Sequence, residues 1–196
     1  MVRGYVVAGG QSSRMGRDKA RLPFGGTTLI EHAIVRALEV TDDVRVLCGP
    51  TRRYEEFGVK VTADEVCGVG PIGGLYSALL SASVDGFERV FWLAVDLPNV
   101  PASLLGSLLK TLDQADVAFA RTPRGLEPLC AAFRTAPALE AVRRALLHGQ
   151  LKLTDALSAL KTATVDADAG VLANVNTEAE WAQVLATRAA SVRPPH

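Results

Sequence analysis

The stretch that decides the fold is residues 4–19, which reads GYVVAGGQSSRMGRDK. Its first four residues form a short apolar run, which predicts a buried strand. Glycines follow directly at Gly9 and Gly10, so the strand is expected to end in a loop whose backbone can approach a ligand closely. In α/β proteins ligands bind beyond the carboxyl ends of the strands, so functional residues are expected in the loops that follow strands.

Outward from this stretch, short apolar runs alternate with longer amphipathic ones, which predict strands and helices respectively. The predicted strands are residues 4–7, 44–47, 59–62, 90–95, 117–120 and 129–133. The predicted helices are residues 28–39, 74–83, 101–112, 135–148 and 177–190. The run at 90–95 is apolar on both faces, as expected for a central strand covered by helices on both sides. The fold class is therefore α/β, a three-layer α/β/α Rossmann-like architecture with a mostly parallel central sheet.

The composition excludes several classes of protein. The chain has 196 residues, of which 48% are hydrophobic, so we expect one domain over residues 1–190 and a short tail at 191–196. Lys plus Arg and Asp plus Glu both number 21, and this balance argues against a nucleic-acid partner. The three cysteines lack a CxxC spacing and predict reduced thiols. With neither a membrane-length apolar run nor a signal peptide, a soluble cytoplasmic protein without membrane contact is expected.

The glycine loop after the first strand has the features of a phosphate-binding site. Its consecutive amides can cradle phosphate oxygens, and Arg14 and Lys19 supply positive charge. It is neither a Rossmann GxGxxG nor a Walker A loop, because the glycine spacing differs from both. The alternative is an ordinary glycine turn with solvated cations.

Two further loops follow predicted strands. Asp96 ends the apolar run at 90–95, where a carboxylate could hold Mg²⁺ together with phosphate oxygens. The alternative role for Asp96 is to cap the helix at Pro101, a role for which Asn99 is better placed. The loop at 64–74 contains Asp64 and several glycines and leads into a helix N-terminus, a natural site for an anion or a base. A buried turn without a ligand is the alternative for this loop.

Taken together, these loops resemble a known family. The matching segments are Ala8-Gly9-Gly10-x-Ser12-x-Arg14-Met15-Gly16-x-Asp18-Lys19, Leu22-Pro23-Phe24, Gly70-Pro71-Ile72-Gly73-Gly74-Leu75, Asp96-Leu97-Pro98, Glu127-Pro128-Leu129-Cys130-Ala131 and Asn174-Val175-Asn176-Thr177-x-x-Glu180. This set resembles the nucleotidyltransferases of molybdenum cofactor synthesis, the guanylyltransferases in particular, from residue 4 to about residue 185.

The resemblance implies a nucleotidyltransferase fold with a nucleotide-binding half at about 1–100 and an acceptor half at about 101–190. It implies catalytic roles for Lys19, Arg14 and Asp96, with Asp96 also holding Mg²⁺. The implied nucleotide-binding residues are Val7, Ala8, Gly9, Gly10, Ser12, Arg14, Lys19, Asp64, Gly73 and Asp96. Asn174 and Asn176 are implied near the acceptor.

The implied reaction is transfer of GMP from GTP to the phosphate of molybdopterin, with release of pyrophosphate. The nucleophile is already anionic, so no strong general base is required, and His32, His148 and His196 all lie outside the three loops. A monomer is expected, with transient contacts to molybdenum cofactor synthesis proteins and molybdoenzymes. The alternatives are a cytidylyltransferase, a sugar-phosphate nucleotidyltransferase, and a non-enzymatic carrier or regulator that binds nucleotide.

The choice of base is expected to depend on Gly9. Relatives that transfer cytidylate tend to carry Ala-Ala-Gly at positions 8–10, so a second glycine predicts extra room for a purine beside the loop. The chain departs from the family pattern at Cys48-Gly49-Pro50, where relatives often place an asparagine, and no base contact is assigned there.

Overall fold

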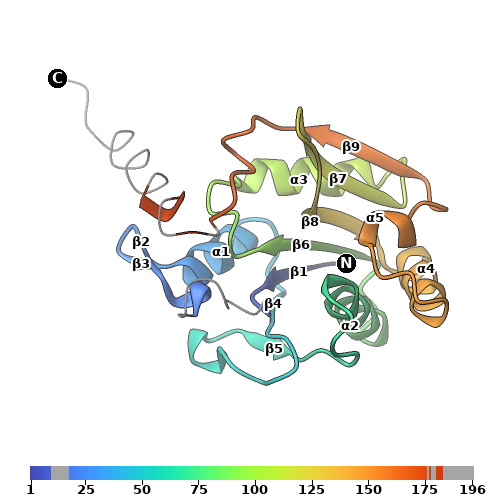
Figure 1. Ribbon diagram of the computed structural model, residues 1–196, viewed down its shortest axis with the longest axis horizontal. Helices are drawn as coiled ribbons and strands as arrows, with labels where there is room; N and C mark the ends of the chain where they lie inside the picture. The colour runs from blue at the N-terminus through green and yellow to red at the C-terminus, as the bar shows by residue number, and fades with distance from the viewer. Residues whose placement is uncertain (10–17, 176, 178–179, 183–196) are drawn as a thin grey trace.

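The computed structural model describes residues 1–9, 18–175, 177 and 180–182 (Figure 1). The strands are β1 (Val2–Val7), β2 (Pro23–Phe24), β3 (Thr27–Thr28), β4 (Val44–Leu47), β5 (Lys60–Thr62), β6 (Arg89–Ala94), β7 (Val117–Thr122), β8 (Gly125–Arg134) and β9 (Thr162–Asp166). The helices are α1 (Leu29–Leu38), α2 (Pro71–Val84), α3 (Ala102–Thr111), α4 (Thr135–Leu147) and α5 (Leu153–Ala156).

Seven of the strands form one sheet in the order β5-β4-β1-β6-β8-β7-β9. Only β8 runs antiparallel to its neighbours, so the mostly parallel sheet predicted from the sequence is confirmed. The chain passes from β1 to β4 on one side and later from β5 to β6 on the other. This reversal of direction beside β1 opens a crevice at the carboxyl ends of β1 and β6, where ligands bind in such sheets.

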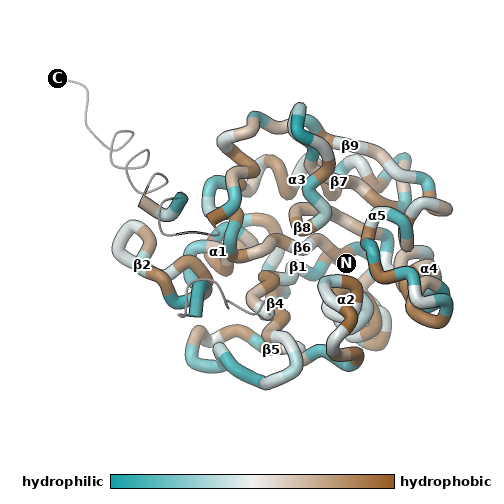
Figure 2. Tube along the Cα trace, in the orientation of Figure 1, coloured by the Kyte–Doolittle hydropathy of each residue, from teal (hydrophilic) through white to brown (hydrophobic). Residues whose placement is uncertain are grey.

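The two faces of the sheet carry separate layers of helices, as Figure 1 shows. Val6 of β1 and Leu93 of β6 pack with α1 and α3 in one apolar cluster. Tyr5 and Trp92, the adjacent positions, pack with α2, α4 and α5 in the other. Apolar residues accordingly gather along the central strands in Figure 2. The three-layer architecture is confirmed.

Local sequence signals explain several helix starts. Thr28 and Glu31 form the predicted capping box at α1, and Pro71 occupies the first turn of α2. The N-cap of α3 is Pro101, without a side-chain hydrogen bond. Asn99 therefore does not cap α3, and its amide instead donates to the Gly170 carbonyl at 3.0 Å.

Other elements differ from the sequence-based expectation. The strand β9 reads TATVD and alternates between exposed and half-buried positions at the sheet edge, so it has no apolar run to reveal it. The two-residue strands β2 and β3 and the four-residue helix α5 are too short to produce a periodic signal. Of the helix predicted at 177–190, residues 180–182 are helical and most of the remainder lies outside the described residues.

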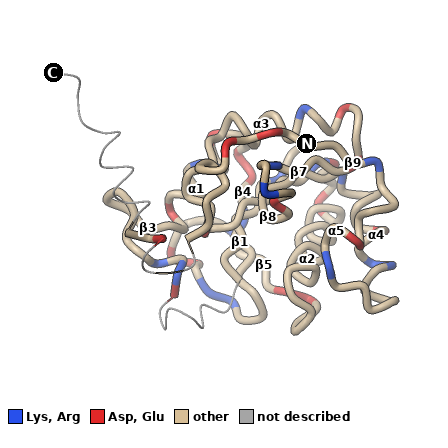
Figure 3. Tube along the Cα trace, turned by 45° about the horizontal axis from the view of Figure 1, so that its top comes forward, with Lys and Arg blue, Asp and Glu red and all other residues tan. Residues whose placement is uncertain are grey.

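Charges of both signs are interspersed along the chain in Figure 3, in agreement with the net charge of zero. Within the residues that the structure describes, no helix has both the length and the hydropathy needed to cross a bilayer. The predicted division into two halves near residue 100 remains a prediction, since strands from both sides of that position share one sheet.

Candidate active site

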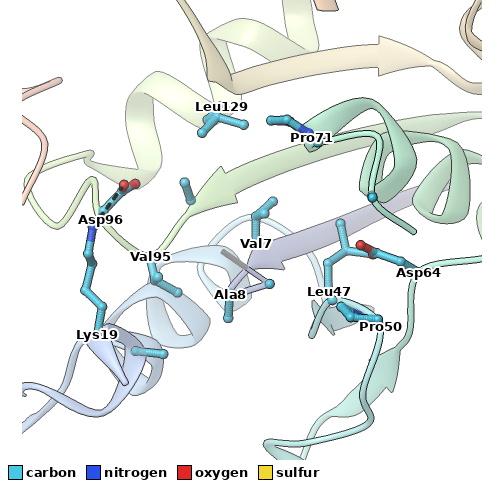
Figure 4. A pocket seen from close by; sticks show the side chains of 17 residues that line it. Val7, Ala8, Lys19, Leu47, Pro50, Asp64, Pro71, Val95, Asp96 and Leu129 are labelled. Atoms are coloured by element: carbon cyan, nitrogen blue, oxygen red, sulfur yellow. Dashed lines mark ion pairs between the residues drawn. The ribbon is translucent and has the colours of Figure 1, made fainter. Parts of the chain in front are cut away.

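A cavity of about 420 Å³ lies at the carboxyl ends of β1, β4 and β6 (Figure 4). It is lined by Val7, Ala8, Gly9, Lys19, Ala20, Leu47, Gly49, Pro50, Asp64, Gly68, Gly70, Pro71, Gly74, Ala94, Val95, Asp96 and Leu129. The structure thus brings together residues from all three loops that the sequence singled out. The predicted residues Gly10, Ser12, Arg14 and Asn176 lie outside the described part of the chain.

Lys19 and Asp96 form an ion pair at one end of this cavity. Lys19 Nζ lies 3.7 Å from Asp96 Oδ2, and the two side chains are only 16% and 21% exposed. Lys19 begins a 3₁₀ turn (Lys19–Arg21), whereas Asp96 follows the end of β6. Burial raises the pKa of the Asp96 carboxyl, and the Lys19 charge opposes that rise. A cation and an anion are therefore held together in a partly desolvated site.

The second oxygen of Asp96 has no hydrogen-bond donor in the part of the chain that the structure describes. Asp96 Oδ1 is buried and has no hydrogen-bond partner among the described residues. A buried acceptor without a partner is costly, and a bound cation would satisfy it. The capping alternative for Asp96 is wrong, because α3 begins six positions later with Pro101 as its N-cap. No group of three or more His, Cys, Asp or Glu able to hold a metal occurs in the described ranges. At this end of the cavity the Asp96 carboxylate suits Mg²⁺ when phosphates supply further oxygens.

Asp64 lies on the opposite side of the cavity from this pair, as Figure 4 shows. It follows β5, its backbone N–H donates to the Gly49 carbonyl at 2.9 Å, and burial raises its pKa. A Cβ on Gly74 would lie 3.6 Å from Asp64 Oδ1. The two ends of the cavity therefore carry different chemistry: an ion pair at one end and a single carboxylate at the other.

Gly73 was predicted to bind the nucleotide, but it packs against the backbone of the 64–70 loop. It does not line the cavity; instead it is buried, and a Cβ there would collide with the Val66 carbonyl oxygen. Its backbone N–H donates to the Gly70 carbonyl at 3.1 Å. Gly73 thus allows α2 to pack against the 64–70 loop, and its neighbour Gly74 reaches the cavity. A nucleotide contact by Gly73 itself stays a prediction.

The prediction that Gly9 makes room for a purine base is wrong. A Cβ on Gly9 would lie 2.6 Å from the Gly49 nitrogen and 2.8 Å from the Gly49 Cα. The missing side chain therefore makes room for the backbone after β4, not for a base in the cavity. Gly49 and Pro50 themselves line the cavity, and sequence reasoning missed both. The signal that could have found them is a glycine placed, like Gly9, directly after a strand of the same sheet.

Asn174, which was predicted to lie near the acceptor, directly precedes a residue that is hydrogen-bonded to Asp96. The Val175 N–H donates to the Asp96 carbonyl oxygen at 2.9 Å, and the Asn174 side chain acts to lower the pKa of the Glu127 carboxylate. Burial raises the pKa of Glu127, and the nearby Asp96 charge acts in the same direction. Glu127 was not predicted as a site residue, and the strand motif that contains it was the available signal.

His32 also contributes to the site, although its position in the sequence lies outside the loops. It belongs to α1, and its Nε2 lies 2.9 Å from the carbonyl oxygen of Pro98. Its ring also meets Phe24 edge-on at 4.7 Å. His32 therefore supports the loop that carries Asp96.

Comparisons with known proteins show which proteins the chain and its fold resemble. A model of the MobA-like NTP transferase domain matches residues 4–163. A protein of Mycobacterium marinum named "Probable molybdenum cofactor guanylyltransferase" is 32% identical, over 98% of this chain and 94% of that relative. The fold resembles the crystal structure of molybdopterin-guanine dinucleotide biosynthesis protein A from Archaeoglobus fulgidus, with a TM-score of 0.78, 22% identity and coverage of 96% and 99% of the two chains. It also resembles Rv0371c of Mycobacterium tuberculosis in complex with manganese, with a TM-score of 0.70, 16% identity and coverage of 95% and 98%.

Proposed function

The chain belongs to the MobA-like NTP transferase domain family, and from this we propose that it is a molybdenum cofactor guanylyltransferase. The reaction is transfer of GMP from GTP to the phosphate of molybdopterin, which gives the guanine dinucleotide form of the cofactor and releases pyrophosphate. The observation that carries the proposal is the Lys19–Asp96 pair at the carboxyl ends of β1 and β6. This pair places a cation for phosphate and an oxygen for a metal ion within one cavity.

The nucleotide is proposed to span the cavity from Asp64 to Lys19. The backbones of Val7, Ala8 and Gly9, continuing through Gly10 and Ser12, would contact the nucleoside and its first phosphate, while Lys19 and Arg14 bind the triphosphate. Guanine presents N–H donors on its N1 and N2 atoms, and the Asp64 carboxylate is an acceptor suited to such an edge. Cytosine offers only one amino donor on the corresponding edge, so this contact favours GTP.

A divalent cation, proposed to be Mg²⁺, fits the donors present. Asp96 Oδ1 is a buried oxygen without a partner among the described residues, and the manganese complex of Rv0371c supports a divalent metal in a protein of this fold. When bound, such a cation would neutralise phosphate charge and orient the α-phosphate. Asp96 would hold it, and Lys19 remains available to the departing pyrophosphate.

The protein contributes to this reaction by positioning the two substrates and by neutralising their negative charge. The attacking phosphate is ionised at neutral pH, so no residue has to remove a proton from it. Two polyanions must be brought into line, which the glycine loop and Lys19 achieve on the nucleotide side. Asn174, which directly precedes the residue bound to the Asp96 carbonyl, and Asn176 are proposed to contact the acceptor.

Nucleotide preference tests the proposal directly. Purified protein is melted with GTP–Mg²⁺, CTP–Mg²⁺ or UTP–Mg²⁺, and a ligand that binds the native state raises the melting temperature. The largest rise is expected with GTP. A larger rise with CTP or UTP would favour the cytidylyltransferase or sugar-phosphate alternatives. Release of pyrophosphate from GTP only when molybdopterin is present would exclude a carrier or regulator that binds nucleotide without turnover.

A further inference from the structure

Tyr54 lies in the segment between β4 and β5 and has an unusual backbone conformation. Its side chain is only 1% exposed, and its φ of 75° makes it the one non-glycine residue with positive φ in the described ranges. A bulky residue in the left-handed region is strained. Such strain persists only where surrounding contacts maintain it, and it is common near functional sites.

The Tyr54 hydroxyl is bound to the residue that precedes Lys19. Tyr54 Oη lies 2.9 Å from each carboxylate oxygen of Asp18. Asp18 Oδ1 also accepts from the Ala20 N–H at 3.1 Å, which caps the turn that begins at Lys19. Burial and the Asp18 charge raise the pKa of the Tyr54 phenol, so the hydroxyl stays protonated and donates to Asp18.

Two arginines also lie near Asp18. Arg21 Nε lies 3.4 Å and Arg53 Nη1 lies 3.9 Å from Asp18 Oδ2. Their side chains are 49% and 37% exposed, and ion pairs that are open to water contribute little. The buried Tyr54 hydroxyl is therefore the main constraint on the Asp18 carboxylate. That carboxylate is held against the segment between β4 and β5, whereas the next side chain, Lys19, extends to Asp96 (Figure 4).

We propose that Tyr54 is a positioning residue for Lys19: its hydroxyl holds the Asp18 carboxylate against the β4–β5 segment and so prevents this charge from competing with the triphosphate for the Lys19 ammonium. The proposal rests on the proposed function, in which Lys19 binds the triphosphate. Asp18 is adjacent in sequence, so a released carboxylate could reach the ammonium by side-chain rotation alone.

The test compares Tyr54→Phe with the double variant Asp18→Asn/Tyr54→Phe. Tyr54→Phe should lower kcat about tenfold, the scale of a misplaced catalytic group, while KM for GTP changes by less than about threefold because the glycine loop remains. Asparagine caps a helical turn about as well as aspartate but carries no charge. The double variant should therefore recover kcat to within about threefold of the wild-type value. If the Tyr54 hydroxyl had only a structural role, removing the Asp18 charge would not restore kcat.

Tyr5→Phe is the matched control, because Tyr5 is also fully buried in the sheet but packs with α2 and α4, away from Asp18. It should leave kcat unchanged. The proposal is overturned if Tyr54→Phe keeps wild-type kcat, or if the double variant stays as slow as the single one. Tyr54→Phe alone leaves the Asp18 carboxylate without its hydroxyl partner and could therefore unfold the protein. The double variant lacks this charge and keeps the test usable. In that case the kcat of the double variant must match that of Asp18→Asn. A wild-type protein that releases no pyrophosphate from GTP and molybdopterin would instead contradict the proposed function.

Discussion

The two oxygens of the Asp96 carboxylate have different surroundings, and this asymmetry is the central feature of the molecule at the scale of residues. Oδ2 faces Lys19 Nζ at 3.7 Å, while Oδ1 is buried without a hydrogen-bond donor among the described residues. Burial of a carboxylate without full compensation is unfavourable. A protein retains such a group where it gains something on binding, and a metal–nucleotide complex would supply the missing positive charge.

Replacing Asp96 by asparagine should separate catalysis from stability. Asp96→Asn keeps the size of the side chain but removes the charge that is proposed to hold the metal, so turnover should fall on the order of 10²–10³. The melting temperature without nucleotide should change little, because the lost carboxylate was itself poorly solvated. Titration of Mg²⁺ against activity checks the role. Coincident curves for variant and wild type would exclude Asp96 as the metal ligand, and Asp113→Asn, at an exposed aspartate of the α3–β7 connection, is the control.

Gly9→Ala should act on the fold of the loop and not on the choice of base. The new Cβ would lie 2.6 Å from the Gly49 nitrogen, so the backbone after β4 must move, at a cost of about 1–3 kcal/mol. Dissociation constants for GTP and CTP should therefore rise by the same factor. Gly106→Ala is the control, since a Cβ at Gly106 meets nothing within 4 Å. A selective loss of GTP would restore the explanation based on room for a purine.

At the scale of elements, the buried Arg3 ties together three segments at the opposite end of the sheet from the cavity. Its Nη1 lies 2.8 Å from Asp85 Oδ2 at the end of α2, and its Nε pairs with Asp43 in the turn before β4. Asp85 also accepts from Arg45 of β4 at 2.7 Å. A buried arginine requires such partners, and these contacts fix the end of α2 relative to β1 and β4.

The Arg3 cluster predicts a dependence of stability on pH. The hydrogen bond from Arg3 lowers the pKa of Asp85 below its ordinary value of 3.8. A lowered pKa in the folded state contributes stability above the unfolded-state value, and this contribution is lost as pH falls through the folded-state pKa. Wild type should therefore be more stable than Asp85→Asn at neutral pH, and the difference should vanish in acid.

Urea unfolding of both proteins between about pH 2 and pH 7 measures this difference. Asp168→Asn, at an exposed aspartate, serves as the control and should parallel the wild type at every pH. A difference between wild type and Asp85→Asn that is constant over the whole range would show that the Asp85 charge does not stabilise the cluster.

At the scale of the whole molecule, the segment after residue 172 joins the β2–α1 region to the loop that carries Asp96. Val175 is fully buried with Leu22, Phe24 and Leu29, and its N–H donates to the Asp96 carbonyl. Trp181 extends this contact, because its ring lies 5.9 Å from that of Phe24. The end of the described chain thus packs against Leu22 and Phe24 and binds the backbone of the residue proposed to hold the metal.

This connection predicts a coupled loss of stability and activity. Val175→Ala should lower the free energy of unfolding by about 1–3 kcal/mol and also lower kcat several-fold, because the Asp96 backbone loses support. Val142→Ala, at an equally buried valine of α4, should lower stability by a similar amount and leave kcat unchanged. Urea unfolding and steady-state kinetics on both variants check this. Equal kcat values would mean that the segment contributes to stability alone.

The sequence by itself determined the elements and the loops that surround the cavity. The capping box at α1, the apolar run of β6 and the alternation of strands with helices depend on neighbours a few residues apart, so a linear reading detects them. Because parallel strands end at the same edge of a sheet, the same reading also placed Lys19, Asp64 and Asp96 together. Strand β9 and helix α5 escaped it, since neither has an apolar period of sufficient length.

Only the tertiary structure decided what each of these residues touches. Tyr54 meets Asp18 across 36 positions of sequence, His32 meets the Asp96 loop across 66, and Gly9 gives way to the backbone of Gly49. Such contacts leave no trace in local propensity, because their energies depend on distances between segments that approach one another only after the sheet has formed. The physical reason is that hydrogen bonds, charge pairs and steric exclusion act over a few ångströms of space, whatever the separation along the chain.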